Sequence, residues 1–224
     1  MSGSRFDRTA ERYAAAARQK DWQSFVEFCR PQPGDRALDV GAGPAILSGA
    51  LASSVGQAVA VDVSEAMLAQ APPGVSTVVG KAERLPFDDG GFTLVTCVNT
   101  LHHVEDPGAV LREMVRVLAP GGRLVVQDYL ADHDPDQAQR WETVERLRDP
   151  GHGRLPRDGE VQQALQRHGV FLDEERAWES AWDLEPWIEM ASPPEADAER
   201  IRRLVGADRF TLRAWRGRFV SRPA

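Results

Sequence analysis

Lysine is scarce in this 224-residue chain, where only Lys20 and Lys81 occur among 27 basic residues. No Gly-Lys-Ser or Gly-Lys-Thr sequence is present, which excludes the phosphate loop of P-loop nucleotide hydrolases. Neither Tyr13 nor Tyr129 is followed by a lysine four residues later, the pair that many short-chain reductases use. The scarcity of lysine therefore removes two common classes of nucleotide-binding enzyme.

Cysteine and long apolar runs are also scarce. Cys29 and Cys97 both lie within apolar patterns, which favours buried side chains over a disulfide framework or a metal site. No apolar run approaches the roughly 20 residues that a membrane-spanning helix needs. The first seven residues are polar and include an acid, unlike a signal peptide. We therefore expect a cytoplasmic protein with no membrane span.

The chain also has no net positive charge. The net charge of −7 argues against general nucleic-acid binding, which needs a basic surface. The exception is the arginine-rich segment 199–222. Such a segment could meet an anionic substrate or partner, but arginines of this kind are more often part of a solvated face.

Strand and helix patterns alternate along the chain after residue 35, which predicts an α/β fold. The expected fold is a Rossmann-like doubly wound sheet of about seven strands, mostly parallel, with helical additions after the fifth strand. We treat the whole chain, 1–224, as a single domain. The expected helices are 6–29, 45–54, 64–70, 107–118, 134–148, 158–168 and 195–204, and the expected strands are 36–40, 57–63, 75–80, 92–99, 123–130, 170–178 and 209–220.

The chain is organised around the stretch 37–45, with the sequence Ala-Leu-Asp-Val-Gly-Ala-Gly-Pro-Ala. A buried strand, a tight glycine turn and a helix start, followed by an acid (Asp62) after the next strand, form a nucleotide cradle. Ile46 stands where a dinucleotide-binding motif has its third glycine, and Asp39 suits a cationic amino group better than a pyrophosphate. A tight turn that binds nothing is the alternative reading.

Several motifs together resemble one family. They are the glycine stretch 39–43, Asp62, the run 82–87 (Ala-Glu-Arg-Leu-Pro-Phe), Leu-His-His at 101–103 and Leu-Ala-Pro-Gly-Gly at 118–122. Together with a Phe-Asp-Arg and a tyrosine in the first helix, they resemble class I S-adenosylmethionine-dependent methyltransferases, in the branch of the ubiquinone and menaquinone biosynthesis enzymes. A weaker resemblance links 146–152 to some uncharacterised bacterial members.

The resemblance implies S-adenosylmethionine as the cofactor and assigns its contacts. Asp39, Gly41 and Gly43, with Ala42 between the glycines, would hold the methionine part, and Tyr13 would close over its carboxylate. The nucleoside and ammonium contacts would come from Asp62 at the ribose, Val63 and Met67 beside the adenine, Ala82 and Glu83 at the adenine edge, and Asn99 at the ammonium. Two positions depart from the family, because Lys81 replaces an acid and Ala45 replaces a third glycine.

Candidate catalytic residues follow the fourth and fifth strands. One histidine of the pair His102-His103 could simply pack near the cofactor, or His103 could be a general base. Asp128 could orient or deprotonate a nucleophile, or be a solvated strand end. Adjacent histidines chelate poorly and no third ligand is suitably spaced, so we expect no metal. Tyr129, Arg148 and His152 are the candidate acceptor contacts.

We therefore predict transfer of a methyl group from S-adenosylmethionine to an O, N or C atom of a small molecule, by a monomer or homodimer. In this interpretation 1–34 is a helical cap, 35–130 binds the cofactor and 131–224 supplies the acceptor side. The tryptophans of that last part would line the acceptor pocket or belong to the core. The alternatives are a non-catalytic S-adenosylmethionine-binding regulatory module, a nicotinamide oxidoreductase and an RNA methyltransferase.

Overall fold

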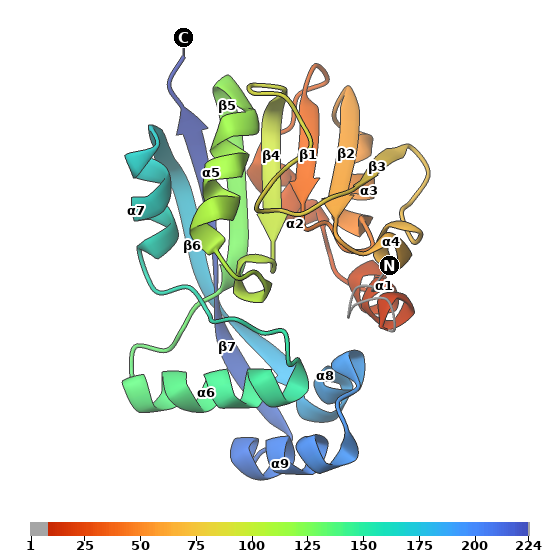
Figure 1. Cartoon of the computed structure of the whole chain (residues 1–224), viewed down its shortest axis with the longest axis vertical. Helices are drawn as coiled ribbons and strands as arrows, with labels where there is room; N and C mark the ends of the chain where they lie inside the picture. Colours follow the sequence, from red (N-terminus) through yellow and green to blue (C-terminus); the bar gives the residue numbers. More distant parts are fainter. Residues whose placement is uncertain (1–8, 224) are drawn as a thin grey trace.

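The computed structural model describes residues 9–223, which form a seven-stranded sheet flanked by helices (Figure 1). The strand order is β3-β2-β1-β4-β5-β7-β6. β1 to β5 run parallel to one another, whereas β7 runs antiparallel to both β5 and β6. The predicted fold class is confirmed. The strands are β1 Arg36–Val40, β2 Gln57–Asp62, β3 Val75–Val79, β4 Phe92–Val98, β5 Leu118–Tyr129, β6 Val170–Asp183 and β7 Arg209–Ser221.

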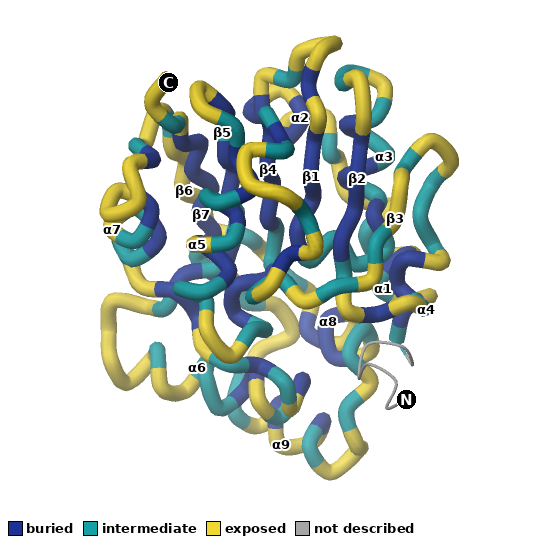
Figure 2. The backbone as a smooth tube through the Cα atoms, turned by 45° about the horizontal axis from the view of Figure 1, so that its top comes forward, coloured by how far each residue is buried: buried dark blue, intermediate teal, exposed yellow. Residues whose placement is uncertain are grey.

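Helices pack on both faces of the sheet because its central strands are apolar on both sides. Leu94 and Val95 are adjacent in β4 and face opposite clusters, one packed on α2 and α3 and the other on α5 and α7. Figure 2 shows the buried central strands between these layers. The helices are α1 Ala10–Arg18, α2 Gln23–Cys29, α3 Ile46–Ala52, α4 Glu65–Leu68, the 3₁₀ turn η2 Leu101–His103, α5 Pro107–Val117, α6 Pro135–Arg148, α7 Glu160–Arg167, α8 Leu184–Ala191 and α9 Glu195–Val205.

The predicted N-terminal helix 6–29 is two helices, and its first residues lie outside the described chain. α1 ends in a tight turn, in which the N–H groups of Gln19 and Lys20 donate to carbonyls three residues earlier. The indole N–H of Trp22 donates to the Ala17 carbonyl at 2.8 Å and holds the bend. Apolar spacing could not reveal the break, because both helices bury residues in the same periodic pattern.

β6 and β7 form a long antiparallel pair that extends below the parallel strands (Figure 1). The prediction ended β6 at Trp178, but pairing with β7 continues to Asp183, and helix α8, which was not predicted, follows at once. This strand is exposed along most of its length, so burial leaves little alternation in its sequence.

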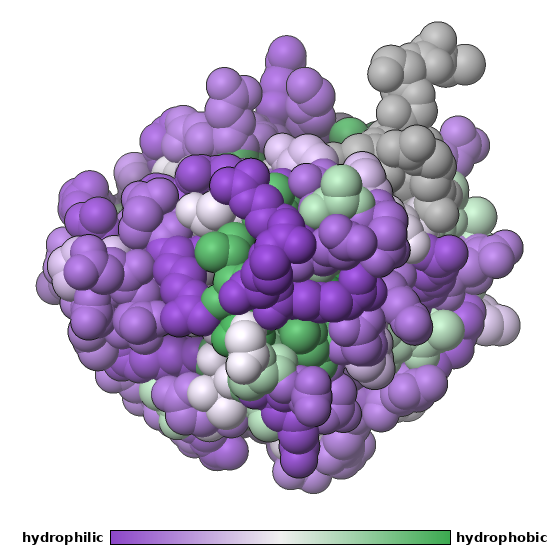
Figure 3. All heavy atoms as spheres, turned by 90° about the horizontal axis from the view of Figure 1, so that it is seen from below, coloured by the Kyte–Doolittle hydropathy of each residue, from purple (hydrophilic) through white to green (hydrophobic). Residues whose placement is uncertain are grey.

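The lower ends of β6 and β7, with α6, α8 and α9, form what we call the lower lobe (Figure 1). Its own core contains Val144, Trp187 and Ile201, with Trp141 and Phe210 packed against it. The face of the molecule seen from below is mostly hydrophilic, with hydrophobic groups gathered near its middle (Figure 3). The lower lobe therefore packs on its own apolar centre and faces the sheet edge across a cavity.

The arginine-rich segment is built into this architecture, because α9 and β7 contain most of its arginines. Arg202 pairs with Glu185 and Glu195, and Arg218 pairs with Asp173 and Glu174. Further ion pairs link Arg209 to Asp183 and Arg213 to Asp158. Much of the positive charge of this segment is therefore used in internal ion pairs. No helix in the described range 9–223 is long and apolar enough to cross a membrane.

Candidate functional site

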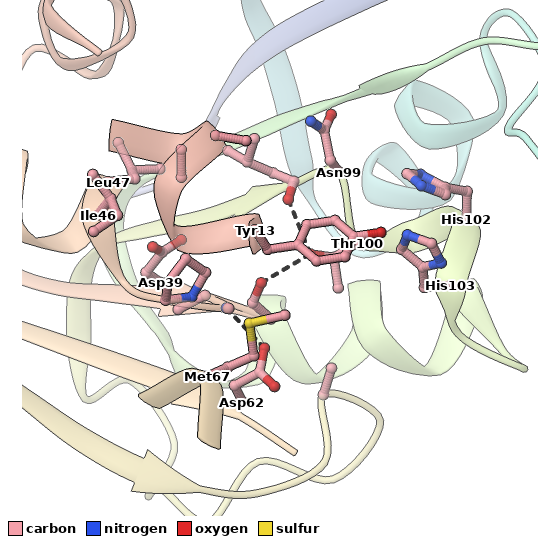
Figure 4. Close-up of a pocket in the computed structure, with 18 of the residues that line it drawn as sticks. Tyr13, Asp39, Ile46, Leu47, Asp62, Met67, Asn99, Thr100, His102 and His103 are labelled. Atoms are coloured by element: carbon pink, nitrogen blue, oxygen red, sulfur yellow. Dashed lines mark hydrogen bonds between the residues drawn. The ribbon is translucent and has the colours of Figure 1, made fainter. Parts of the chain in front are cut away.

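A cavity of about 560 Å³ lies between the carboxyl ends of the parallel strands and the lower lobe. Open α/β sheets bind ligands at this edge, because the loops leaving the strands diverge there. The wall is formed by α1, the turn after β1, the ends of β2, β4 and β5, the loop after β3, and α6 and α8. Figure 4 shows the half of this wall nearest the glycine turn.

The turn after β1 is fixed by its glycines. Gly41 has a φ of +66°, and a Cβ added there would lie 2.3 Å from the side chain of Thr100. The Thr100 hydroxyl donates to the Gly41 carbonyl at 3.2 Å, so the turn and the end of β4 are in direct contact. Gly43 has a φ of +53° and open space where a Cβ would stand. Only glycine adopts the positive φ at both positions without strain, and only glycine leaves room for Thr100 at position 41.

Asp39 is buried directly beneath this turn. Its carboxylate accepts hydrogen bonds from the hydroxyls of Ser48 and Thr96, each at 2.8 Å. Burial raises the pKa of Asp39 to about 6; the two hydrogen bonds lower it and the charge of Asp62 raises it. The cavity therefore has a carboxylate that a bound cation would keep ionised.

Asp62 joins the turn to the next helix at the end of β2. One carboxylate oxygen accepts the Gly43 N–H and the other the Ser64 N–H, both at 2.8 Å. Ser64 then caps α4, because its hydroxyl accepts the Met67 N–H at 3.1 Å. Val63 and Met67 line the cavity beside Asp62.

Ala82, Glu83 and Asn99 complete the cavity wall around the turn. Asn99 takes a left-handed φ of +52° just after β4, a conformation that asparagine tolerates better than most residues. Its N–H donates to the Gln127 carbonyl at 2.8 Å, which anchors it to β5. The predicted cofactor contacts in 39–43, 62–67, 82–83 and at Asn99 therefore all meet in one cavity.

His102 and His103 both line the cavity, on the η2 turn. Nδ1 of His102 lies 2.5 Å from Asp128, whose carboxylate also accepts the N–H groups of Leu101 and Tyr129. Burial lowers the pKa of His102, but the charge and hydrogen bond of Asp128 outweigh it, so the pKa lies above its usual value. Asp128 itself is buried behind His102 and does not line the cavity. Of the two readings of Asp128, the solvated strand end is wrong, because the carboxylate is a buried partner of His102.

His103 and His152 each lie beside another carboxylate. His103 Nδ1 lies 3.4 Å from Asp149, and His152 Nε2 lies 3.0 Å from Glu142. The His152 side chain is fully buried behind the other two rings, and it is absent from the cavity wall. His152 was predicted to contact the acceptor, and the structure places it beyond reach of a molecule in the cavity.

Tyr13 and Arg148 approach the cavity from opposite sides, α1 and α6. Tyr13 projects across the cavity with its hydroxyl toward the two histidines (Figure 4). Burial raises the pKa of Tyr13, and the nearby charge of Arg148 lowers it. Arg148 is itself buried and donates twice to Glu145, at 3.0 and 2.9 Å, with its guanidinium 4.3 Å from the Trp187 ring. The positive charge of Arg148 is thus balanced within the site.

Comparison with known proteins decides the family. Residues 38–126 match the family model described as a methyltransferase domain. Over 206 residues the chain is 30% identical to the uncharacterized methyltransferase YcgJ of Bacillus subtilis, covering 87% of this chain and 81% of that protein. The chain belongs to the class I S-adenosylmethionine-dependent methyltransferases.

Other similarities support the same assignment. The demethylmenaquinone methyltransferase of Mycolicibacterium gilvum is 43% identical over 134 residues, which cover 56% of this chain and 59% of that protein. The crystal structure of B. subtilis YcgJ has a TM-score of 0.85 at 24% identity, covering 91% of this chain and 98% of that one. The [4+2]-cyclase SpnF also matches, with a TM-score of 0.68 at 18% identity, over 91% of this chain and 80% of that one. The likeness to these two structures concerns the fold alone.

The tryptophans of this methyltransferase divide between the two predicted roles. Trp182 lines the cavity, and Trp187 both lines it and belongs to the lower-lobe core, against which Trp141 packs; Trp215 belongs to the core of the sheet. Further cavity residues were not predicted, because nothing in their local sequence distinguishes them from surface or core positions; among them are Lys20, Trp22, Glu145 and Met190. Within 9–223 no group of three His, Cys, Asp or Glu side chains could hold a metal ion.

Proposed function

We propose that this methyltransferase transfers the methyl group of S-adenosylmethionine to a small-molecule acceptor held between the sheet edge and the lower lobe. The observation that carries the proposal is that one cavity contains both halves of such a site. Asp39 and Asp62 lie at one end, and the aromatic wall of Tyr129 and Trp182 lies at the other. Its volume is within the range of about 300–1,000 Å³ usual for small-molecule sites.

The residues at the turn fit the cofactor chemically. Asp39 and the Asn99 carbonyl suit the methionine ammonium, and Asp62 suits the ribose hydroxyls. The open space at Gly43 leaves room for a ligand to approach the backbone. Ala82 and Glu83, on the loop after β3, would read the adenine edge, with Val63 and Met67 beside the ring. Tyr13 would close over the methionine carboxylate.

When bound, S-adenosylmethionine supplies a methyl group that its sulfonium already makes electrophilic. The protein's part is to hold the acceptor atom in line at about 3 Å and to exclude water. Tyr13, on α1, covers one side of the cavity, and Trp182 and Trp187 cover the lower-lobe side. These side chains provide enclosure and alignment.

A proton acceptor is needed when the attacking atom carries a proton. We assign this role to His102, because Asp128 holds its Nδ1 and leaves Nε2 as the ring nitrogen for a ligand. Asp128 would act through His102 as a positioning residue. His103 also lines the cavity, and its predicted role as the base stays a prediction.

The test of the cofactor site is Asp62→Ala. Loss of hydrogen bonds to a carboxylate should weaken binding of S-adenosylhomocysteine by about 1–3 kcal/mol, measured by calorimetry. Asp88→Ala is the matched control, because Asp88 is exposed on the neighbouring loop and does not line the cavity. Unchanged affinity in Asp62→Ala would remove the cofactor from this cavity.

Methyl transfer itself needs a separate assay. A cofactor carrying a labelled methyl group, presented with a broad set of small acceptors, should give a labelled product with the wild-type protein. Cofactor binding without any labelled product would favour the regulatory module. Thermal stabilisation by NAD in place of S-adenosylhomocysteine would favour the oxidoreductase.

A further inference from the structure

A second hollow of about 930 Å³ adjoins the cavity, and we call it the outer hollow. Asn99 and Tyr129, at the ends of β4 and β5, line both spaces, as do Lys20 and Trp182. A molecule that presents one end to the methyl donor at Asn99 therefore has room for the rest of its body in the outer hollow.

The outer hollow has an aromatic wall drawn from several elements. Trp22 and Phe25 come from the start of α2, Trp178 and Trp182 from β6, and Trp187 from α8. Aromatic side chains favour flat, apolar partners, which they contact through ring faces and edges. The wall therefore favours an acceptor with an aromatic body.

A buried cation lies against this wall. Arg216 of β7 is only 9% exposed, and its guanidinium lies 4.6 Å from the Phe25 ring centroid and 5.5 Å from that of Trp178. Its hydrogen bonds go to neutral oxygens, the Gln127 amide at 2.8 Å and the Ser24 carbonyl at 3.2 Å. Burial lowers the pKa of Arg216 to about 10, and the guanidinium still carries its charge at neutral pH.

Arg216 differs from the other buried arginines in having no carboxylate partner. Among residues 9–223, no Asp or Glu oxygen lies within 4 Å of its guanidinium, whereas Arg218 pairs with Asp173 and Arg148 pairs with Glu145. A buried charge without a counter-ion costs free energy, which an anionic ligand would offset. Arg216 is therefore a buried positive charge to which an anionic ligand could bind.

Lys20 is a second cation that lines the outer hollow, and its side chain is more exposed than that of Arg216. Its ammonium lies 5.8 Å from the Trp22 ring centroid and 5.9 Å from that of Trp182, at the boundary of the two spaces. No carboxylate of the described chain lies within 4 Å of it, and the surrounding protein lowers its pKa. The acids that line the outer hollow, Asp21, Asp183 and Glu189, are all exposed, and Asp183 already pairs with Arg209.

We infer that the outer hollow recognises an aromatic carboxylate as the methyl acceptor, with Arg216 binding its anionic group and Lys20 adding a second positive charge at the boundary of the hollow. The inference rests on the proposed function and narrows its acceptor class. A guanidinium is planar and presents paired donors that match the two oxygens of a carboxylate. The carboxylate would remain in the outer hollow while another atom of the acceptor faces the methyl donor near Asn99 and His102.

The test measures binding to protein saturated with S-adenosylhomocysteine and requires no turnover. The probes are three charged and neutral pairs: 4-hydroxybenzoate and its amide, indole-3-acetate and its amide, and 3-hydroxy-2-naphthoate and its amide. The wild-type protein should bind at least one carboxylate ten times or more tighter than its amide. Arg216→Gln should reduce that preference about tenfold, and Lys20→Gln should reduce it as well.

Matched controls separate this role from general effects of charge. Arg176 lies opposite Arg216 in the register of β6 and β7, but its side chain forms an ion pair with Glu174 at the surface. The Arg176→Gln variant should therefore keep the preference for carboxylate over amide. Arg18→Gln serves in the same way for Lys20, two residues away. Because Arg216 packs on Phe25 and Phe28, Lys20→Gln at the exposed end of α1 tests the inference even if Arg216→Gln does not fold.

Two results would overturn the inference. One is the absence of any carboxylate preference across the three pairs in the wild-type protein. The other is an equal loss of S-adenosylhomocysteine affinity in Arg216→Gln and Lys20→Gln, which would assign these cations to the cofactor's own carboxylate. In both cases the wild type still binds S-adenosylhomocysteine, so the proposed function stands; failure of that binding would overturn the function instead.

Discussion

At the scale of single residues, two carboxylates of the cavity, Asp39 and Asp62, have different hydrogen-bond partners and different roles. Asp62 accepts two backbone N–H groups and shapes the glycine turn, whereas Asp39 accepts only hydroxyl hydrogen bonds and is buried. A buried carboxylate with neutral partners is costly to ionise, and a cationic ligand lowers that cost. Asp39 should therefore make cofactor binding depend on pH.

We expect the affinity for S-adenosylhomocysteine to fall as the pH drops below about 6, the pKa of Asp39 in the free protein. The sign follows because binding the ligand ammonium requires the ionised carboxylate, and protonation opposes it. One pH unit below that pKa, the affinity should be about tenfold weaker. Calorimetry from pH 5 to pH 8 measures the change. Asp39→Asn keeps the size of the side chain and one of the two oxygen acceptors, and it cannot ionise. It should bind more weakly but with a flat profile; a flat wild-type profile would contradict the assignment.

The sequence was informative about residues that follow strand ends directly. Asp39, Asp62 and Asn99 lie within one residue of the end of a parallel strand, and such positions meet at one edge of a sheet. Asp128 also lies next to a strand end, but its side chain turns inward to His102. This orientation depends on tertiary packing, so the local sequence does not predict it. Lys20 and Arg216, far apart in sequence, line the same hollow only because the long-range pairing of β7 brings Arg216 there.

At the scale of elements, the turn between β1 and α3 is the most constrained piece of backbone in the site. Gly41 combines a positive φ with close contact to Thr100, and Ala45 also takes a left-handed φ, of +55°. A non-glycine residue in this conformation costs about 1–2 kcal/mol. The family's third glycine, absent here, would relieve that strain at position 45.

Gly41→Ala should lower the free energy of unfolding by about 2–5 kcal/mol, from the strained φ and from overpacking against Thr100. Gly43→Ala is the control, since its Cβ would enter open space and only the strain of about 1–2 kcal/mol remains. Urea denaturation of both variants measures the difference. Equal losses would show that Thr100 moves aside and that the contact does not fix the turn.

Element boundaries were predictable where a chemical signal marks them. Ser64 and Pro107 start helices as expected, and Asp134 caps α6 through the N–H groups of Asp136 and Gln137. The bend at Trp22 depends on one indole hydrogen bond, and α8 follows a strand without an intervening loop. Such features depend on tertiary contacts, so periodicity alone did not separate them.

At the scale of the whole molecule, β7 holds the structure together. It pairs with β5 on one side and β6 on the other, buries Trp215 and Phe219 in the main core, and extends into the lower lobe. The arginine-rich segment predicted as a solvated face is, in part, this strand. The composition shows that this segment is positively charged, but it does not predict that the segment forms a strand between β5 and β6.

Ending the chain after Gly206 should therefore abolish cooperative folding, because β6 and the lower lobe lose their connection to β5. Circular dichroism with urea titration tests this, and a chain ending after Ser221, which keeps all of β7, should unfold like the wild type. A shortened chain that still unfolds cooperatively would show that the first five strands are stable alone.

The position of β7 also fixes the order in which the sheet assembles during synthesis. β6 leaves the ribosome before β7 but has no place beside β5 until β7 has emerged to separate them. Until then the outer edge of β5 presents unpaired backbone groups, and the aromatic side chains of β6 are exposed. Unpaired edges of this kind invite association between nascent chains. β7, which contains the proposed acceptor-binding Arg216, is thus also the strand whose pairing protects the nascent chain from aggregation.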